Sequence, residues 1–202
     1  MSPRPYRMSR RRESADENRV RILAAARELL ALPQEAARFS MEEVARKAGV
    51  ARMTVYYQFG SLRGLLEGLL DSLASAGGMQ HLAEAFSEPD ALVAVDQFIA
   101  VFMKFWESDR LVIRALGAYT SIDPEFATVV AERSGWRREG ARVLLQRLAK
   151  QTGRPNRKEM RDAEDLLFML TSFATYDSLA GSGRHLDQVT ALLQRVVRQV
   201  LS

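Results

Sequence analysis

The segment from residue 52 to residue 58 carries side chains that can read a DNA duplex. The planar guanidinium of Arg52 matches the O6 and N7 acceptors of guanine, and Met53 can contact a thymine methyl group. Four further side chains of the segment can donate hydrogen bonds to phosphate oxygens, namely Thr54, Tyr56, Tyr57 and Gln58. This combination predicts a helix that lies in the major groove, with a half-buried aromatic as the alternative for either tyrosine.

The residues before and within this segment have the spacing of a helix-turn-helix unit. Ala45 is the small residue that such a unit needs where its helices cross, and Gly49, four positions later, tolerates a positive φ at the turn. Val55, six positions further on, supplies the apolar side chain that the crossing buries. These offsets predict helices over 41–48 and 52–59, with an ordinary pair of packed helices as the alternative.

Caps and helix breakers predict that the rest of the chain is also α-helical. Pro33 ends a first helix that starts at about residue 16, because its ring cannot follow the preceding turn. Ser40 and Glu43 form a capping box before the next helix. Further helices are predicted over about 62–76, 91–106, 109–119, 124–151, 158–180 and 186–201. Alternating runs typical of strands are absent from the sequence, so we expect an all-α fold.

Basic residues are concentrated in the N-terminal part of the chain. Residues 1–60 hold twelve Lys and Arg against seven Asp and Glu, whereas the remainder holds seventeen against eighteen. Such a localised excess favours contact with a polyanion. Residues 1–15 are expected to form a basic disordered arm. Its arginines are candidates for the minor groove, with a solvated tail as the alternative: Arg7, Arg10, Arg11 and Arg12.

Three blocks of this sequence, 21–30, 39–50 and 54–59, resemble the TetR family of bacterial transcriptional regulators. The resemblance implies a helix-turn-helix DNA-binding domain over 16–61 and an effector-binding and dimerisation domain over 62–202. It implies a homodimer that binds a pseudo-palindromic operator as a repressor and is released by a small molecule. By position, it also implies backbone contacts for Ser40, Thr54, Tyr56, Tyr57 and Gln58, and base contacts for Arg52 and Met53.

The sequence departs from the family's pattern at three positions. Ala51 stands where Ser is common, which removes a side-chain N-cap usually worth about 1 kcal/mol. Gln58 replaces a frequent His and is still expected to reach phosphate. Leu62 replaces a common Lys and so deletes a charged phosphate contact, for which the neighbouring Arg63 is the candidate substitute.

Two C-terminal stretches predict an interface between two copies of the chain. Residues 186–201 form a helix with one apolar stripe, whereas residues 158–180 are apolar nearly all round. A helix that is apolar on every side must be covered on every side, most simply by a partner subunit in a four-helix, isologous interface. A central helix within a monomer is the alternative.

Aromatic and methionine side chains of the C-terminal part predict either a filled core or the lining of a pocket for an apolar or aromatic effector. Three of them lie on one helical face at intervals of four residues. The candidate pocket residues are Phe98, Phe102, Trp106, Tyr119, Met169, Phe173 and Tyr176.

Other activities find little support in the sequence. The absence of cysteine excludes disulfides and thiolate chemistry, and two histidines are too few for an imidazole-rich metal site. Ser182, His185 and Asp187 lie close in sequence, but a turn before the last helix explains them better than a catalytic triad. We therefore expect no enzyme, no cofactor, no metal, no membrane contact and a cytoplasmic location. A helical adaptor or RNA-binding protein that uses the basic arm is the alternative function.

Overall fold

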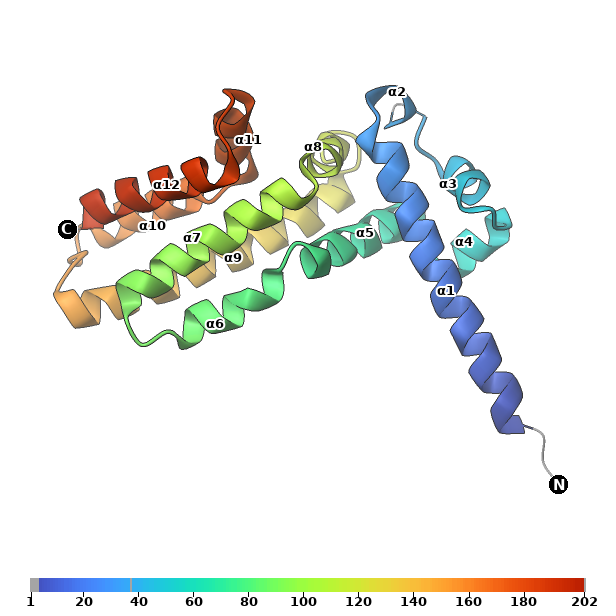
Figure 1. Cartoon of the computed structure of the whole chain (residues 1–202), viewed down its shortest axis with the longest axis horizontal. Helices are drawn as coiled ribbons and strands as arrows, with labels where there is room; N and C mark the ends of the chain where they lie inside the picture. The colour runs from blue at the N-terminus through green and yellow to red at the C-terminus, as the bar shows by residue number, and fades with distance from the viewer. Residues whose placement is uncertain (1–3, 37, 202) are drawn as a thin grey trace. The chain divides into compact units, whose positions relative to one another are not determined.

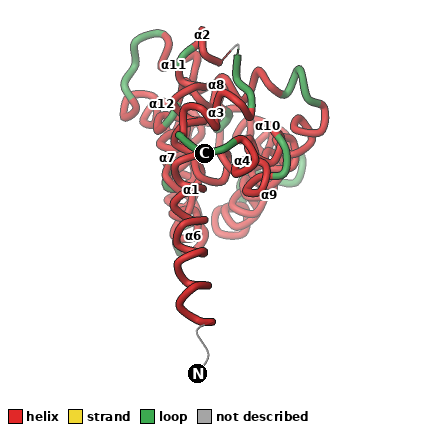
Figure 2. Tube along the Cα trace, turned by 90° about the vertical axis from the view of Figure 1, so that its right-hand side faces the viewer, coloured by secondary structure: helices red, strands yellow, loops and turns green. Residues whose placement is uncertain are grey.

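The computed structural model describes residues 4–36 and 38–201, and Figure 2 shows helices joined by loops over this range. These residues contain no strand, so the all-α prediction is confirmed. They form two compact units. The first unit comprises the described part of residues 1–72 together with Leu111–Ala127, and the second comprises Leu73–Arg110 together with the described residues from Thr128 onward. The predicted boundary at residues 61 and 62 stays a prediction.

The first unit is built mainly from short helices around a long one (Figure 1). Its elements are α1 (Arg4–Ala31), α2 (Pro33–Ala36), α3 (Met41–Ala48), α4 (Arg52–Phe59), most of α5 (Leu62–Ala76) and most of α8 (Arg110–Tyr119). Helix α1 packs against both α3 and α4. Helices α1, α3, α4, α5 and α8 each bury apolar side chains completely, namely Ile22, Val44, Val55, Leu65 and Val112.

The N-terminal end of α1 differs from the disordered arm that the sequence predicts for residues 1–15. The helix begins at Arg4, and residues 1–3 lie outside the described part of the chain. Arg, Met, Glu and Ala are all good helix formers, and they make up much of this stretch. Pro5 falls in the first turn, where its missing N–H has no intrahelical partner to lose. The prediction overlooked this compatibility.

The second unit is a bundle of longer helices. Its elements are η1 (Met79–His81), α6 (Leu82–Ser87), α7 (Ala91–Ser108), most of α9 (Pro124–Thr152), α10 (Met160–Leu170), α11 (Phe173–Gly181) and α12 (Leu186–Leu201). Helix α7 lies between α6 and α12 and packs against both (Figure 1). One core joins Phe98 of α7, Leu144 of α9, Leu167 of α10 and Leu193 of α12.

The single helix predicted over 158–180 is two helices in the structure. Helix α10 ends at Leu170, and α11 begins at Phe173. The hydroxyl of Thr171 bonds back to the carbonyl of Leu167 at 2.7 Å, and the hydroxyl of Ser172 accepts from the amide of Thr175 at 3.2 Å. Ser172 is therefore an N-cap with extended backbone angles, which interrupts the helical ladder. Polar side chains inside an apolar run explain the break.

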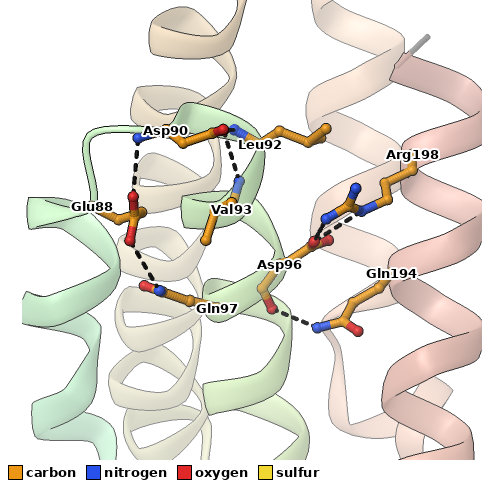
Figure 3. Close-up of polar contacts among 8 residues, drawn as sticks. All are labelled: Glu88, Asp90, Leu92, Val93, Asp96, Gln97, Gln194 and Arg198. Atoms are coloured by element: carbon orange, nitrogen blue, oxygen red, sulfur yellow. Dashed lines mark hydrogen bonds and ion pairs between the residues drawn. The ribbon is translucent and has the colours of Figure 1, made fainter.

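A polar side chain caps the start of α7. The carboxylate of Asp90 accepts from the amides of Leu92 and Val93 at 2.8 and 3.1 Å (Figure 3). It is thus a regular N-cap, and the predicted helix start is confirmed. The short elements η1 and α6 before it were not predicted. Among the described residues, no helix combines the length and the apolar character that a bilayer span requires.

Candidate nucleic-acid interface

The turn between α3 and α4 has the geometry that the sequence predicts. Gly49 adopts φ 64° and ψ 37°, in the left-handed region that glycine occupies without strain. Ala45 of α3 is buried where the two helices cross, and Val55, on the inner side of α4, is completely buried. The amide of Val50 donates to the carbonyl of Ala45 at 3.0 Å and closes the turn. The prediction from three steric offsets is confirmed, and with it the bounds of both helices.

Helix α3 has a side-chain N-cap, whereas helix α4 has none. The hydroxyl of Ser40 accepts from the amide of Glu43 at 3.2 Å, so Ser40 is engaged as the N-cap of α3 while its own proton stays available for a phosphate oxygen. Ala51, at the N-cap position of α4, has no side-chain bond to offer, as the sequence indicates. The amides of the first turn of α4 therefore lack a side-chain acceptor from the cap.

Helix α4 presents three of the predicted contact residues to solvent. Tyr57 is 84% exposed and Met53 is 56% exposed. The side chain of Arg52 is 57% exposed. Thr54 and Tyr56 are half-buried on the same helix. An exposed guanidinium, a thioether and a phenol on one eight-residue helix are available for base and phosphate contacts.

Arg52 is held in place by two neighbours. Its Nη1 lies 2.7 Å from the Oε1 of Glu42, on α3, and its Nη2 donates to the hydroxyl of Tyr56 at 3.2 Å. The guanidinium also lies over the ring of Tyr56, 5.3 Å from the ring centre. The bond to Tyr56, followed by the charge of Glu42, raises the pKa of Arg52 above its ordinary value. Glu42 and Tyr56 thus orient the side chain that is the candidate base reader.

Gln58 and Arg63 are directed to protein partners. The amide of Gln58 donates to the carbonyl of Ala15, on α1, at 2.9 Å. In return, Arg19 of α1 donates to the carbonyl of Gln58 at 3.4 Å. Arg63 pairs with Glu67 at 3.6 Å and with Glu125. Gln58 therefore ties α4 to α1, and Arg63 would have to leave two carboxylates to reach a phosphate.

Sequence reasoning missed Arg21, which supports the turn from α1. Its Nη2 donates to the carbonyls of Ala48 and Gly49 at 2.6 and 3.2 Å. Carbonyls at the C-terminal end of a helix lack intrahelical partners and carry partial negative charge, so a guanidinium stabilises them. Lys47 and Glu28 add a second bridge between α3 and α1, at 3.1 Å. These partners are too distant in sequence for local patterns to pair them.

The minor-groove hypothesis concerns side chains outside the described part of the structure. The backbone of Arg7, Arg10, Arg11 and Arg12 belongs to α1, but their side chains are not among those described. Their contact with DNA stays a prediction.

Three candidate pocket residues lie in the core of the second unit. Phe98, Phe102 and Tyr176 are almost completely buried there. The rings of Phe98 and Phe102 meet edge to face with centres 4.9 Å apart. The hydroxyl of Tyr176 bonds to the carboxylate of Glu107. In this structure, these rings pack against one another and fill the core.

The other candidate pocket residues have different surroundings. Trp106 donates from its indole nitrogen to the carbonyl of Thr171 at 2.9 Å and packs against Phe173, with ring centres 5.6 Å apart. Met169 is 54% exposed. Tyr119 belongs to the first unit, where its ring contacts Phe39. The other six candidate pocket residues all belong to the second unit.

A polar hollow lies at the surface between α7 and α12. Its lining comprises Asp96, Ala191, Gln194, Arg195, Arg198 and Gln199, none of them a predicted pocket residue. Figure 3 shows Asp96 between the amide of Gln194, which donates to its carbonyl at 3.0 Å, and the guanidinium of Arg198. The Nε of Arg198 lies 2.9 Å from Oδ2 of Asp96. This ion pair links α7 to α12.

Comparison with known proteins agrees with this geometry. Residues 22–69 match the family described as bacterial regulatory proteins, tetR family. EthR of Mycobacterium tuberculosis, an HTH-type transcriptional regulator, is 33% identical over 118 residues, which are 57% of this chain and 54% of EthR. The match thus spans about half the length of this curated relative.

Solved structures share the fold over most of the chain. A TetR-like transcriptional regulator from Rhodococcus sp. RHA1 has a TM-score of 0.69 at 17% identity, covering 90% of this chain and 94% of that one. The transcriptional regulator FadR from Bacillus subtilis, in complex with stearoyl-CoA, has a TM-score of 0.66 at 16% identity, covering 91% and 97%. The chain therefore resembles HTH-type transcriptional regulators in its N-terminal sequence and these solved structures in its fold. Residues 22–69 are the part of the chain that matches the tetR family.

Proposed function

We propose that this protein is a transcriptional repressor that binds a pseudo-palindromic DNA operator as a homodimer and leaves it when a small apolar or aromatic molecule binds the second unit. The observation that carries the proposal is the exposed face of α4, with Arg52, Met53 and Tyr57 directed to solvent above a helix-turn-helix whose turn is rigidly specified. A recognition helix of this kind reads base edges in the major groove from its N-terminal residues.

Exposed apolar side chains of the second unit support dimerisation. Trp136 on α9 is 70% exposed, Met169 on α10 is 54% exposed and Val200 on α12 is 54% exposed in the single chain. Large apolar side chains on neighbouring helices are typical of protein interfaces. The predicted interface helices, 158–180 and 186–201, contain two of these three residues. A symmetric dimer would also match the two half-sites of a palindromic operator.

The effector part of the proposal rests on the aromatic side chains of the second unit. Phe98, Phe102, Trp106 and Phe173 form a continuous chain of ring contacts from α7 to α11. FadR, which has this fold, was solved with stearoyl-CoA, an acyl-chain ligand. An effector would enter this aromatic region by displacing packed side chains, which provides a route from binding to a change in helix positions.

Selection of DNA from a random pool tests the proposed function. The full chain should enrich pseudo-palindromic duplexes with half-sites about one helical turn, ~34 Å, or a small multiple apart. Affinity should fall steeply with salt, because phosphate contacts release counterions. Equal affinity for random duplex, or tighter binding to RNA of the same sequence, would contradict a repressor and favour the adaptor or RNA-binding alternative.

A further inference from the structure

A buried arginine stands in the aromatic region of the second unit. Arg137, on α9, is only 8% exposed. Its Nη1 donates to the carbonyl of Phe168, at the end of α10, and to the hydroxyl of Thr171 at 3.0 Å. Its guanidinium lies over the rings of Phe168 and Phe102, at 4.0 and 5.8 Å from their centres. Arg137 thus contacts neutral oxygens and aromatic faces.

The next residue on the same helix provides an internal comparison. Arg138 lies over the same ring, 4.2 Å from the centre of Phe168, but its side chain is 43% exposed and pairs with Asp165 at 2.5 Å. Within the described residues, no such ion pair joins Arg137 to a carboxylate. Two adjacent arginines therefore share an aromatic partner, and the buried one lacks a counter-ion in this part of the chain.

A buried charge without a counter-ion is costly, and a protein normally pairs it or neutralises it. Burial, together with the neighbouring charge of Arg138, lowers the pKa of Arg137 to about 10. The group therefore stays protonated at neutral pH. Carbonyl and hydroxyl acceptors satisfy part of its hydrogen-bonding capacity but do not balance its charge.

The direction of the existing bonds leaves one edge of the guanidinium for a ligand. Both hydrogen bonds of Arg137 start from Nη1. The edge formed by Nε and Nη2 has the fork geometry that binds a carboxylate through two parallel hydrogen bonds. Phe102 and Phe168 flank the group, and Trp106 donates to the backbone of Thr171, beside the same junction. An anion bound there would have apolar and aromatic neighbours.

We propose that Arg137 binds the carboxylate of the effector, so that the effector is an amphipathic organic acid with an apolar or aromatic body. The inference rests on the proposed function, because it specifies the ligand of the same unit. The carboxylate would bind the edge formed by Nε and Nη2, and a shift of the guanidinium toward it would weaken the bonds of Nη1 to Phe168 and Thr171. Those two residues lie where α10 gives way to α11, so ligand binding would release the junction at the point where the helix is already interrupted.

Matched acids and amides test this proposal on the full chain without DNA. The probes are 4-butylbenzoate and decanoate, each compared with its neutral primary amide, and the readout is the dissociation constant from calorimetry. At least one acid should bind about tenfold or more tightly than its amide, as expected for a charge-assisted, bidentate contact. Equal affinity within both pairs, or no binding by either acid, would overturn the proposal.

Three variants test whether the preference for the acid over the amide depends on Arg137. R137M should remove the advantage of the acid, R137K should keep part of it, and R138M should keep it in full because Arg138 already has Asp165 as partner. Loss of the preference in R138M, or its survival in R137M, would contradict the assignment. If R137M does not fold, the wild-type comparison and R137K decide.

Release of DNA is measured separately and distinguishes this inference from the proposed function. An acid that binds through Arg137 but leaves the DNA complex intact would contradict ligand-controlled repression and leave the anion site standing. A DNA complex that dissociates with the amide as readily as with the acid would contradict the anion site at Arg137 and leave ligand-controlled repression standing.

Discussion

The guanidinium of Arg21, on α1, donates a 2.6 Å hydrogen bond to the carbonyl of Ala48, the last residue of α3. A second bond reaches the carbonyl of Gly49, which turns the chain toward α4. A long helix thereby fixes the exit of the first helix of the helix-turn-helix, and the direction of α4 depends on a contact between residues 27 positions apart.

Replacing Arg21 by Ala should loosen this turn. Loss of a charge-assisted bond to a helix C-terminus should lower the free energy of unfolding by about 1–2 kcal/mol. DNA binding should weaken by a similar factor on all sequences, because α4 loses its support and no base contact is removed. Urea unfolding and fluorescence anisotropy measure the two effects. The charge-matched control Arg157→Ala, at an exposed position of the second unit, should change neither.

Gly49→Ala tests the steric requirement of the turn. A residue with a side chain is strained at φ 64°, and the Cβ of an alanine here would lie 3.2 Å from Nη2 of Arg21. We expect the free energy of unfolding to fall by about 1–2 kcal/mol. Gly117→Ala is the matched control, because a Cβ there meets nothing within 4 Å and the residue is helical. It should stabilise the protein by up to about 1 kcal/mol. Equal effects of both substitutions would argue against the turn geometry.

Glu42→Gln separates stability from recognition. Glu42 and Arg52 are both more than half exposed, so their ion pair should contribute less than about 1 kcal/mol to folding. Removal of a negative charge beside the proposed DNA contact should instead tighten binding several-fold at low salt and less at high salt. Glu132→Gln, an exposed residue of the second unit, serves as the control. If both variants change DNA affinity alike, Glu42 is not adjacent to the duplex.

Ser172→Ala tests the interruption between α10 and α11. The substitution removes the hydroxyl that accepts from the amide of Thr175, and loss of an N-cap costs about 1 kcal/mol of unfolding free energy. Ser178→Ala, on the exposed side of α11, should stay within about 0.5 kcal/mol of the wild type. Thermal and urea unfolding of the two variants side by side give the comparison. A wild-type value for Ser172→Ala would mean that the two helices do not need the cap.

The sequence predicts those helices correctly whose ends are set by capping or turn residues close to them in the chain. Ser40 caps α3, Gly49 adopts the left-handed turn and Gly60 ends α4, so the sequence indicates both helices of the unit to the residue. The apolar row of α12 is likewise buried as expected, with Val189 and Val197 in the core. Each of these features depends on residues a few positions apart.

Contacts between distant residues could not be predicted in the same way. Two such contacts join separate helices, Arg21 with Ala48 and Gln58 with Ala15. A third joins Arg137 of α9 to Thr171, between α10 and α11. The sequence also cannot show whether aromatic side chains fill a core or line a pocket. Tyr119, one of the candidate pocket residues, packs against Phe39 of the first unit. The break at Ser172 was missed because apolar periodicity on both sides outweighed one capping residue.

Base selection by Arg52 is the most direct test of DNA reading by α4. Duplexes selected by the wild type and by Arg52→Ala are compared position by position, with Tyr57→Phe as a variant expected to weaken all sequences alike. Arg52→Ala should lose the preference for guanine at one base pair of each half-site, equivalent to about 1–3 kcal/mol, and keep the preferences elsewhere. An unchanged preference at every position, with only a uniform loss of affinity, would show that Arg52 contacts phosphate and that α4 does not read DNA through it.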